Sequence, residues 1–138
     1  YGQFLALNGF AEVMTETVKA MQLSSFALFV LLMAIYFVLG CLMEVSSILA
    51  LTVPLFMPLV VLAGWDAVWF GVIVVSMMEV AAVTPPVGLN LYAVKAALPD
   101  VSLDTIYKGS TPFWIMNVIA VFVLYAFPEI ALYLPKKM

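Results

Sequence analysis

The segment that most clearly offers chemistry is "TPPVGLN", which begins at Thr84 and lies within strongly apolar sequence. Pro85 and Pro86 carry no backbone N–H, so carbonyl groups one turn earlier lose their hydrogen-bond partners. The Thr84 hydroxyl and the Asn90 amide add polar oxygens, and Gly88 allows the chain to turn sharply. Such oxygens are hard ligands of the kind that Na⁺ would accept, by analogy with other hard cations. The segment therefore predicts an interrupted helix that holds a small cation.

A second polar group is the "EVSS" sequence that begins at Glu44. An ionisable side chain deep in apolar sequence indicates a functional site by default. Ser46 and Ser47 add two hydroxyl groups that could join it. A further carboxylate, Glu79, lies five residues before Thr84. If Glu79 is buried, it needs a cation, a hydrogen-bond partner or a raised pKa.

Structural roles compete with these functional ones. The two prolines could kink a helix without binding anything, although the Thr, Gly and Asn beside them make this less attractive. The serine hydroxyls could form hydrogen bonds between helices. For Glu79 we favour a polar neighbour away from the transported molecule.

The composition indicates whether these polar groups lie in a water-soluble protein or in a membrane protein. Of the 138 residues, 67% are hydrophobic and only 9% are charged, against about a quarter charged in an average soluble domain. So few charges could not cover a soluble core, and we expect an all-α membrane protein. The net charge of −3 and the lack of a basic stripe argue against a nucleic-acid partner.

The elements that would position the polar groups follow from apolar runs and helix-capping signals. "EVSS" is a poor turn between two full spans, and an irregular backbone survives in hydrocarbon only inside protein or beside a water-filled cavity. We therefore expect Glu44 to lie at the tip of a re-entrant helical hairpin. The predicted units are the end of a preceding helix with an amphipathic connector helix (1–22), the hairpin (23–64), a discontinuous transmembrane helix (65–98, broken at 84–88), and a loop with the last transmembrane helix (99–138).

Local signals refine the ends of these units. Gly64 can end one helix and Asp66 can cap the next. Trp65 and Trp69 suit an aromatic belt at the membrane interface. In the 99–109 stretch we expect a polar loop with a short capped helix. The chain begins mid-pattern, and we expect it to be a C-terminal part of a larger protein.

The segment from "EVAAVTPPVGLNLYAVKAALPDVSL" to the end of the last apolar run resembles the C-terminal end of the large membrane subunit of tripartite ATP-independent periplasmic (TRAP) transporters. The upstream "LGCLMEVSSILALTVPLFMPLV" is similar to the re-entrant segment of that family. The likeness covers nearly the whole chain and is strongest from residue 39 onward. "TPPVGLNLY" is its most specific part.

This resemblance implies a multi-pass importer of organic acids, such as dicarboxylates, in the inner membrane of bacteria or archaea. It implies Na⁺ as the coupling ion, a small membrane subunit and a soluble periplasmic substrate-binding protein as partners, and one half of an inverted-repeat elevator. By the same likeness, one Na⁺ site and part of the substrate site are carried over to a set of seven residues, with Glu44 as a weaker addition. The set is Ser46, Ser47, Thr84, Pro85, Pro86, Gly88 and Asn90; the Na⁺ candidates are Ser46, Ser47, Thr84 and Gly88.

Other functions remain open on the residues alone. One is an ion-coupled carboxylate carrier without a binding protein, and another is a channel-like pore with a constriction at the break. An enzyme is disfavoured because the chain has no His, no metal-ligand cluster and no nucleophile–base pair. We expect no cofactor beyond Na⁺. With turn 64–66 outside and the 99–111 loop inside, Lys95 and Lys108 obey the positive-inside rule, whereas Lys19 and the C-terminal lysines do not.

Overall fold

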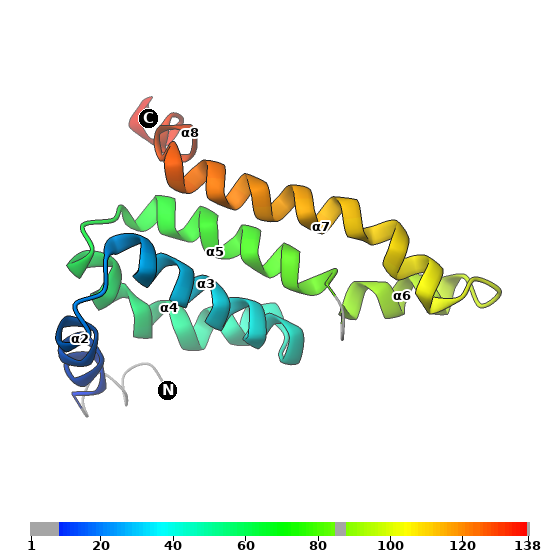
Figure 1. The fold of residues 1–138 in the computed structure, drawn as a ribbon, viewed down its shortest axis with the longest axis horizontal. Helices are drawn as coiled ribbons and strands as arrows, with labels where there is room; N and C mark the ends of the chain where they lie inside the picture. Colours follow the sequence, from blue (N-terminus) through cyan, green and yellow to red (C-terminus); the bar gives the residue numbers. More distant parts are fainter. Residues whose placement is uncertain (1–8, 85–87, 138) are drawn as a thin grey trace.

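The computed structural model describes residues 9–84 and 88–137, without the side chains of residues 10, 11 and 89. Every regular element in this described part is helical, which confirms the all-α prediction. Figure 1 shows the helices as a layered bundle in which α7 runs beside both α5 and α6. The elements are α2 (Phe10–Ala20), α3 (Ser25–Leu42), α4 (Val45–Leu62), α5 (Ala67–Ala82), α6 (Leu89–Ala97), α7 (Leu103–Ala126), α8 (Glu129–Leu132) and the 3-10 helix η1 (Pro135–Lys137).

α3 and α4 form a helical hairpin with a very short turn, Met43 and Glu44. The hydroxyl of Thr52 on α4 lies 2.7 Å from the Ile48 carbonyl and 2.9 Å from the Tyr36 hydroxyl on α3. A hydroxyl has one proton, so if Thr52 donates to Ile48, Tyr36 donates to Thr52. The Tyr36 ring also meets Phe56 edge-on at 5.5 Å between centroids. These contacts hold the two arms together in a buried polar and aromatic seam.

The turn between α4 and α5 follows the local signals closely. Gly64 has φ 71°, a left-handed conformation that costs glycine little. The Asp66 carboxylate accepts hydrogen bonds from the backbone N–H groups of Val68 and Trp69, so it caps α5 as predicted. Trp69, however, is only 2% exposed and donates its indole N–H to the Leu124 carbonyl on α7 at 2.8 Å. The prediction that Trp69 belongs to an interfacial belt is wrong, because its ring packs inside the bundle.

α7 begins earlier in the chain than the sequence predicted, and it ends at Ala126. Ser102 caps it through the backbone N–H of Thr105, and the helix runs without interruption through Gly109 and Pro112 to Ala126. The expected polar loop over 99–109 is therefore mostly helix, and the turn after α6 is short. Lys95 ties this turn down, since its ammonium donates to the carbonyls of Pro99 and Val101 at 2.7 and 2.8 Å.

α2 confirms the amphipathic pattern of the connector. Met14 and Val18 pack against the buried core, whereas Glu12, Glu16 and Lys19 are exposed. α2 lies against α4, and the chain then turns at Gln22, which has φ 48°. The connector helix is therefore part of the bundle.

In the part of the chain that the structure describes, three helices are long and apolar enough to cross a membrane: α3, α4 and α7. α5 is equally apolar but has only 16 residues, about 24 Å of helix. The structure thus supports a membrane protein built of helices. The re-entrant depth of the hairpin stays a prediction.

Candidate functional site

Glu44 serves first as the N-cap of α4. Its two carboxylate oxygens accept hydrogen bonds from the backbone N–H groups of Ser46 at 2.8 Å and Ser47 at 3.0 Å. The Ser47 hydroxyl also lies 3.4 Å from Glu44 Oε2. These donors favour the ionised carboxylate. The predicted tip residues thus form one local unit, in which the carboxylate orients the serines.

The predicted break lies between two described helices. α5 ends at Ala82 and α6 begins at Leu89, so the described helices stop on either side of the break. Thr84 is buried, and its hydroxyl donates to the Val80 carbonyl. Gly88 has φ 52° and caps α6, whereas Asn90 is exposed on that helix. Pro85 and Pro86 lie outside the described residues.

A close helix contact sets the level of the hairpin turn relative to the break. The rings of Phe29 on α3 and Trp69 on α5 lie 6.1 Å apart near the start of both helices. Near their ends, a Cβ added to Gly40 would lie 2.4 Å from the Cβ of Ala81. The parallel helices α3 and α5 are therefore in register. The turn at Glu44 and the break at Thr84 come at the same level, as Figure 1 shows.

This register brings four helix ends together. The C-terminal ends of α3 and α5 carry partial negative charge, and the N-terminal ends of α4 and α6 carry partial positive charge. The predicted residues do not all converge, because Thr84 is buried while the side chains of Ser46, Ser47 and Asn90 are exposed. Glu79 is exposed on α5, so the condition under which it would need a buried partner is not met.

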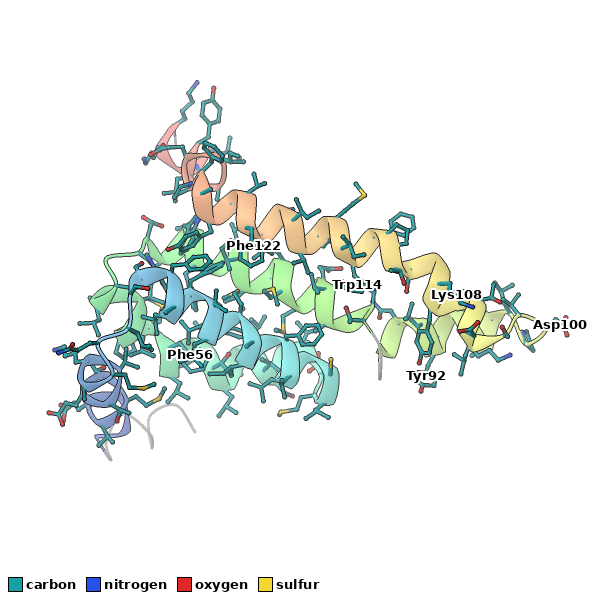
Figure 2. All side chains as sticks on the ribbon, in the orientation of Figure 1. Phe56, Tyr92, Asp100, Lys108, Trp114 and Phe122 are labelled. Atoms are coloured by element: carbon teal, nitrogen blue, oxygen red, sulfur yellow. The ribbon has the colours of Figure 1, made fainter. Side chains whose placement is uncertain are left out.

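α7 contributes a polar stripe that sequence reasoning missed. Its less exposed residues recur every three or four positions, which puts them on one face. Tyr92 on α6 forms a side-chain hydrogen bond with Tyr107 on this face, and Ser110 and Thr111 donate to the Tyr107 carbonyl at 2.9 Å. Figure 2 shows Trp114 on α7 near the end of α5. The three-to-four spacing could have revealed the stripe within "IYKGSTPFW".

The chain matches the family model described as tripartite ATP-independent periplasmic transporter, DctM component, over residues 1–130. The chain belongs to this family. The resemblance stated from "TPPVGLN" and "EVSS" is thereby confirmed.

Curated relatives agree with this assignment. The chain is 32% identical over 133 residues to the C4-dicarboxylate TRAP transporter large permease protein DctM of Rhodobacter capsulatus, with 96% of this chain and 30% of the relative covered. It is 26% identical over 136 residues to the protein of the same name from Pseudomonas aeruginosa, with 99% and 32% covered. It is also 26% identical over 136 residues to the sialic acid TRAP transporter permease protein SiaT of Haemophilus influenzae, with 99% and 22% covered.

This DctM-family chain thus spans about a third or less of these relatives. The relatives named above are transporter permeases by their names. Within the described residues no three His, Cys, Asp or Glu side chains gather where they could hold a metal.

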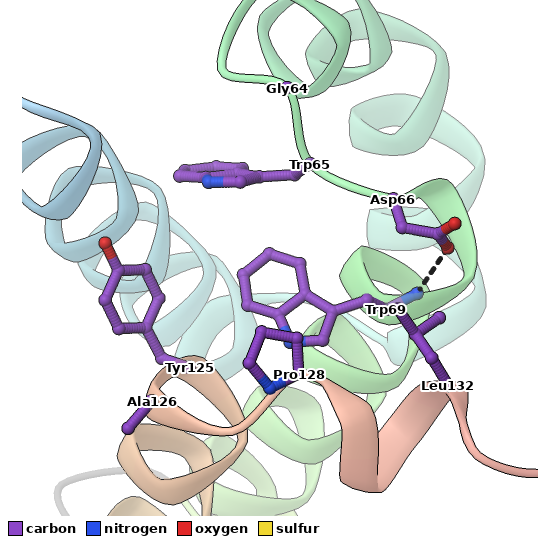
Figure 3. Close-up of a pocket in the computed structure, with 8 residues that line it drawn as sticks. All are labelled: Gly64, Trp65, Asp66, Trp69, Tyr125, Ala126, Pro128 and Leu132. Atoms are coloured by element: carbon purple, nitrogen blue, oxygen red, sulfur yellow. Dashed lines mark hydrogen bonds between the residues drawn. The ribbon is translucent and has the colours of Figure 1, made fainter.

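An open pocket of about 500 Å³ lies at the other end of α5 from the break (Figure 3). Trp65, Trp69 and Tyr125 line it, with Asp66 at its edge. The indole N–H of Trp65 donates to the Ser25 hydroxyl at 3.0 Å, and that of Trp69 is taken by Leu124. In this DctM-family chain the pocket is bordered by aromatic side chains at the start of α5, apart from the candidate site.

Proposed function

We propose that this chain is the C-terminal part of the large permease subunit of a Na⁺-coupled transporter that imports organic acids across the inner membrane. In this proposal the α3–α4 hairpin is re-entrant, and its turn and the broken helix together hold Na⁺ and part of the organic acid. The intact transporter works by an elevator mechanism. It needs a small membrane subunit and a soluble substrate-binding protein.

The observation that carries the proposal is the Gly40–Ala81 contact, which aligns the hairpin turn with the break. α6 and the start of α7 extend beyond this level (Figure 1). α7 has 24 residues, about 36 Å, which is enough to cross the hydrocarbon core of about 30 Å. If α7 crosses the membrane, the turn at Glu44 lies within its thickness. This supports a re-entrant hairpin.

The chemistry at that level suits both proposed cargoes. The carbonyl ends of α3 and α5 favour a cation, and the N–H ends of α4 and α6 favour an anion. Ser46, Ser47, Thr84 and Gly88 are the candidate Na⁺ ligands, through hydroxyl and carbonyl oxygens. A carboxylate would then bind beside the cation that it travels with.

The relatives suggest the class of cargo and the partners. Their names specify C4-dicarboxylates and sialic acid, both of which carry carboxylate groups. The family description specifies a tripartite system. We extend these properties to the complete protein that contains this chain.

The test is uptake of labelled succinate or sialic acid by the complete complex in proteoliposomes, with and without an inward Na⁺ gradient. We expect uptake to require both Na⁺ and the soluble binding protein. Equal uptake in K⁺ alone would contradict the coupling. Saturable uptake without a binding protein would support a two-component carrier, and unsaturable conduction would support a pore.

A further inference from the structure

Trp114 carries an unused hydrogen-bond donor. Its Nε1 atom is buried and has no partner within residues 9–84 and 88–137. The other two tryptophans differ, since Trp65 and Trp69 donate to Ser25 and Leu124. Leaving a buried N–H without an acceptor costs free energy, so such a group calls for an explanation. We look for the acceptor among the groups that would lie beside Trp114 in the working transporter.

Two contacts fix the level of Trp114 along the broken helix. Trp69 donates to the Leu124 carbonyl, and Trp114 lies ten residues, about 15 Å, from Leu124 on α7. Tyr92 bonds to Tyr107, seven residues or about 10 Å from Trp114 on the other side. Because α7 runs antiparallel to α5 and α6, Trp114 lies opposite the end of α5. Figure 2 shows it there.

Trp114 also lies on the α7 face that packs against these helices. The face contains the residues of α7 from Tyr107 onward that are shielded from solvent, at three-to-four spacing. They are Tyr107, Ser110, Thr111, Trp114, Val118, Val121, Leu124 and Tyr125. The hydroxyls of Ser110 and Thr111 are taken by the Tyr107 carbonyl. The Nε1 of Trp114 is thus a buried donor on this face with no partner in the described part of the chain.

The chemistry of an indole N–H selects the acceptor. It is a donor only, so it cannot bind Na⁺ but can bind a carboxylate oxygen. Lys95 donates to the Pro99 and Val101 carbonyls, and Lys108 pairs with Asp104 at 2.6 Å. The chain contains no Arg. A neutral N–H such as that of Trp114 can therefore add to whatever charged donors the complete transporter supplies.

We propose that Trp114 donates its indole N–H to a carboxylate oxygen of the transported organic acid beside the end of α5. This inference rests on the proposed function, because it takes the organic acid as the cargo. It adds a binding residue from α7, outside both the hairpin and the break. The Na⁺ ligands stay on the other helices.

The first test is uptake kinetics of the complete transporter with Trp114→Phe, which keeps an aromatic ring and removes the N–H. We expect KM for succinate or sialic acid to rise about tenfold, with the maximal rate and the half-saturating Na⁺ concentration unchanged. Trp65→Phe is the matched control, because its N–H is used far from the break, and its KM should not change. An unchanged KM in Trp114→Phe, or an equal rise in Trp65→Phe, would overturn the inference.

A second measurement needs no change at Trp114. In a complete transporter whose other tryptophans are replaced by Phe, the emission of Trp114 should shift on adding the organic acid and stay constant with Na⁺ alone. A shift with Na⁺ alone, or none with the acid, would overturn the inference even if Trp114→Phe fails to fold. Acid uptake without Na⁺ dependence would defeat the proposed coupling, yet the Trp114 response would still decide this inference.

Discussion

The Thr84 hydroxyl shows how a single group can serve both the fold and an ion. It donates its proton to the Val80 carbonyl, which leaves its oxygen lone pairs directed away from that bond. Thr84 is buried at the end of α5, where the helix dipole is negative. A cation bound there would contact an oxygen that is already oriented, so the side chain would not need to reorganise.

We therefore expect Thr84→Val to raise the half-saturating Na⁺ concentration about fivefold, the equivalent of one lost oxygen contact. Valine has nearly the same shape, so packing is retained. Thr84→Ser keeps the hydroxyl and is the matched control. Na⁺-titrated uptake in proteoliposomes measures both variants, and equal Na⁺ affinity in Thr84→Val and the parent would remove Thr84 from the ligand set.

At the scale of elements, the packing of α3 on α5 depends on the absence of a side chain at Gly40. An added Cβ would meet the Ala81 Cβ at 2.4 Å, and that atom is fixed to the backbone. The helices must then move apart near the hairpin turn. Their register is what aligns the turn with the break.

We expect Gly40→Ala to lower the free energy of unfolding of the purified complex by about 1–3 kcal/mol, and hence its melting temperature, and to impair uptake. Gly71→Ala, on the same bundle with open space around its Cβ position, is the matched control and should stabilise α5 slightly. Adding Ala81→Gly to Gly40→Ala should restore stability because it vacates the contact. If Gly40→Ala and Gly71→Ala melt alike, the two helices are not held in register by this contact.

The elements were predictable from the sequence where local chemistry decides them. The cap at Asp66, the left-handed Gly64 and the interruption after Ala82 follow from residue type and spacing. Burial of Trp69 was not predictable, because it depends on α7 returning alongside α5. The capping role of Glu44 was not predicted, because only the folded chain shows that α4 begins directly after it.

At the scale of the whole molecule, the two ends of the bundle differ in the segments and the lysines that lie there. The α4–α5 turn, α2 and the C-terminal segment lie at one end, and the α6–α7 turn lies at the other (Figure 1). Lys19, Lys136 and Lys137 are at the first end, and Lys95 and Lys108 at the second. Lysines at both ends make local contacts, Lys108 with Asp104 and Lys136 with Glu129, so charge alone does not orient the molecule.

Cysteine labelling of the complete transporter gives the orientation. In a Cys41→Ala background we expect Ala67→Cys and Asp100→Cys to react with a membrane-impermeant maleimide from opposite sides, because they lie at opposite ends of the bundle. Ala67 is chosen beside Asp66 to preserve the cap, and Asp100 to preserve the Asp104–Lys108 ion pair. Reaction of both from the same side would contradict a membrane crossing by α5 and α6 together.

α7 is hydrogen-bonded to both α5 and α6, the helices on either side of the break. Sliding α6 past α5 would break the Trp69–Leu124 hydrogen bond or the Tyr92–Tyr107 hydrogen bond, so α7 fixes the position of α6 relative to α5. If the proposed elevator movement takes place, we expect these three helices to move as one rigid block.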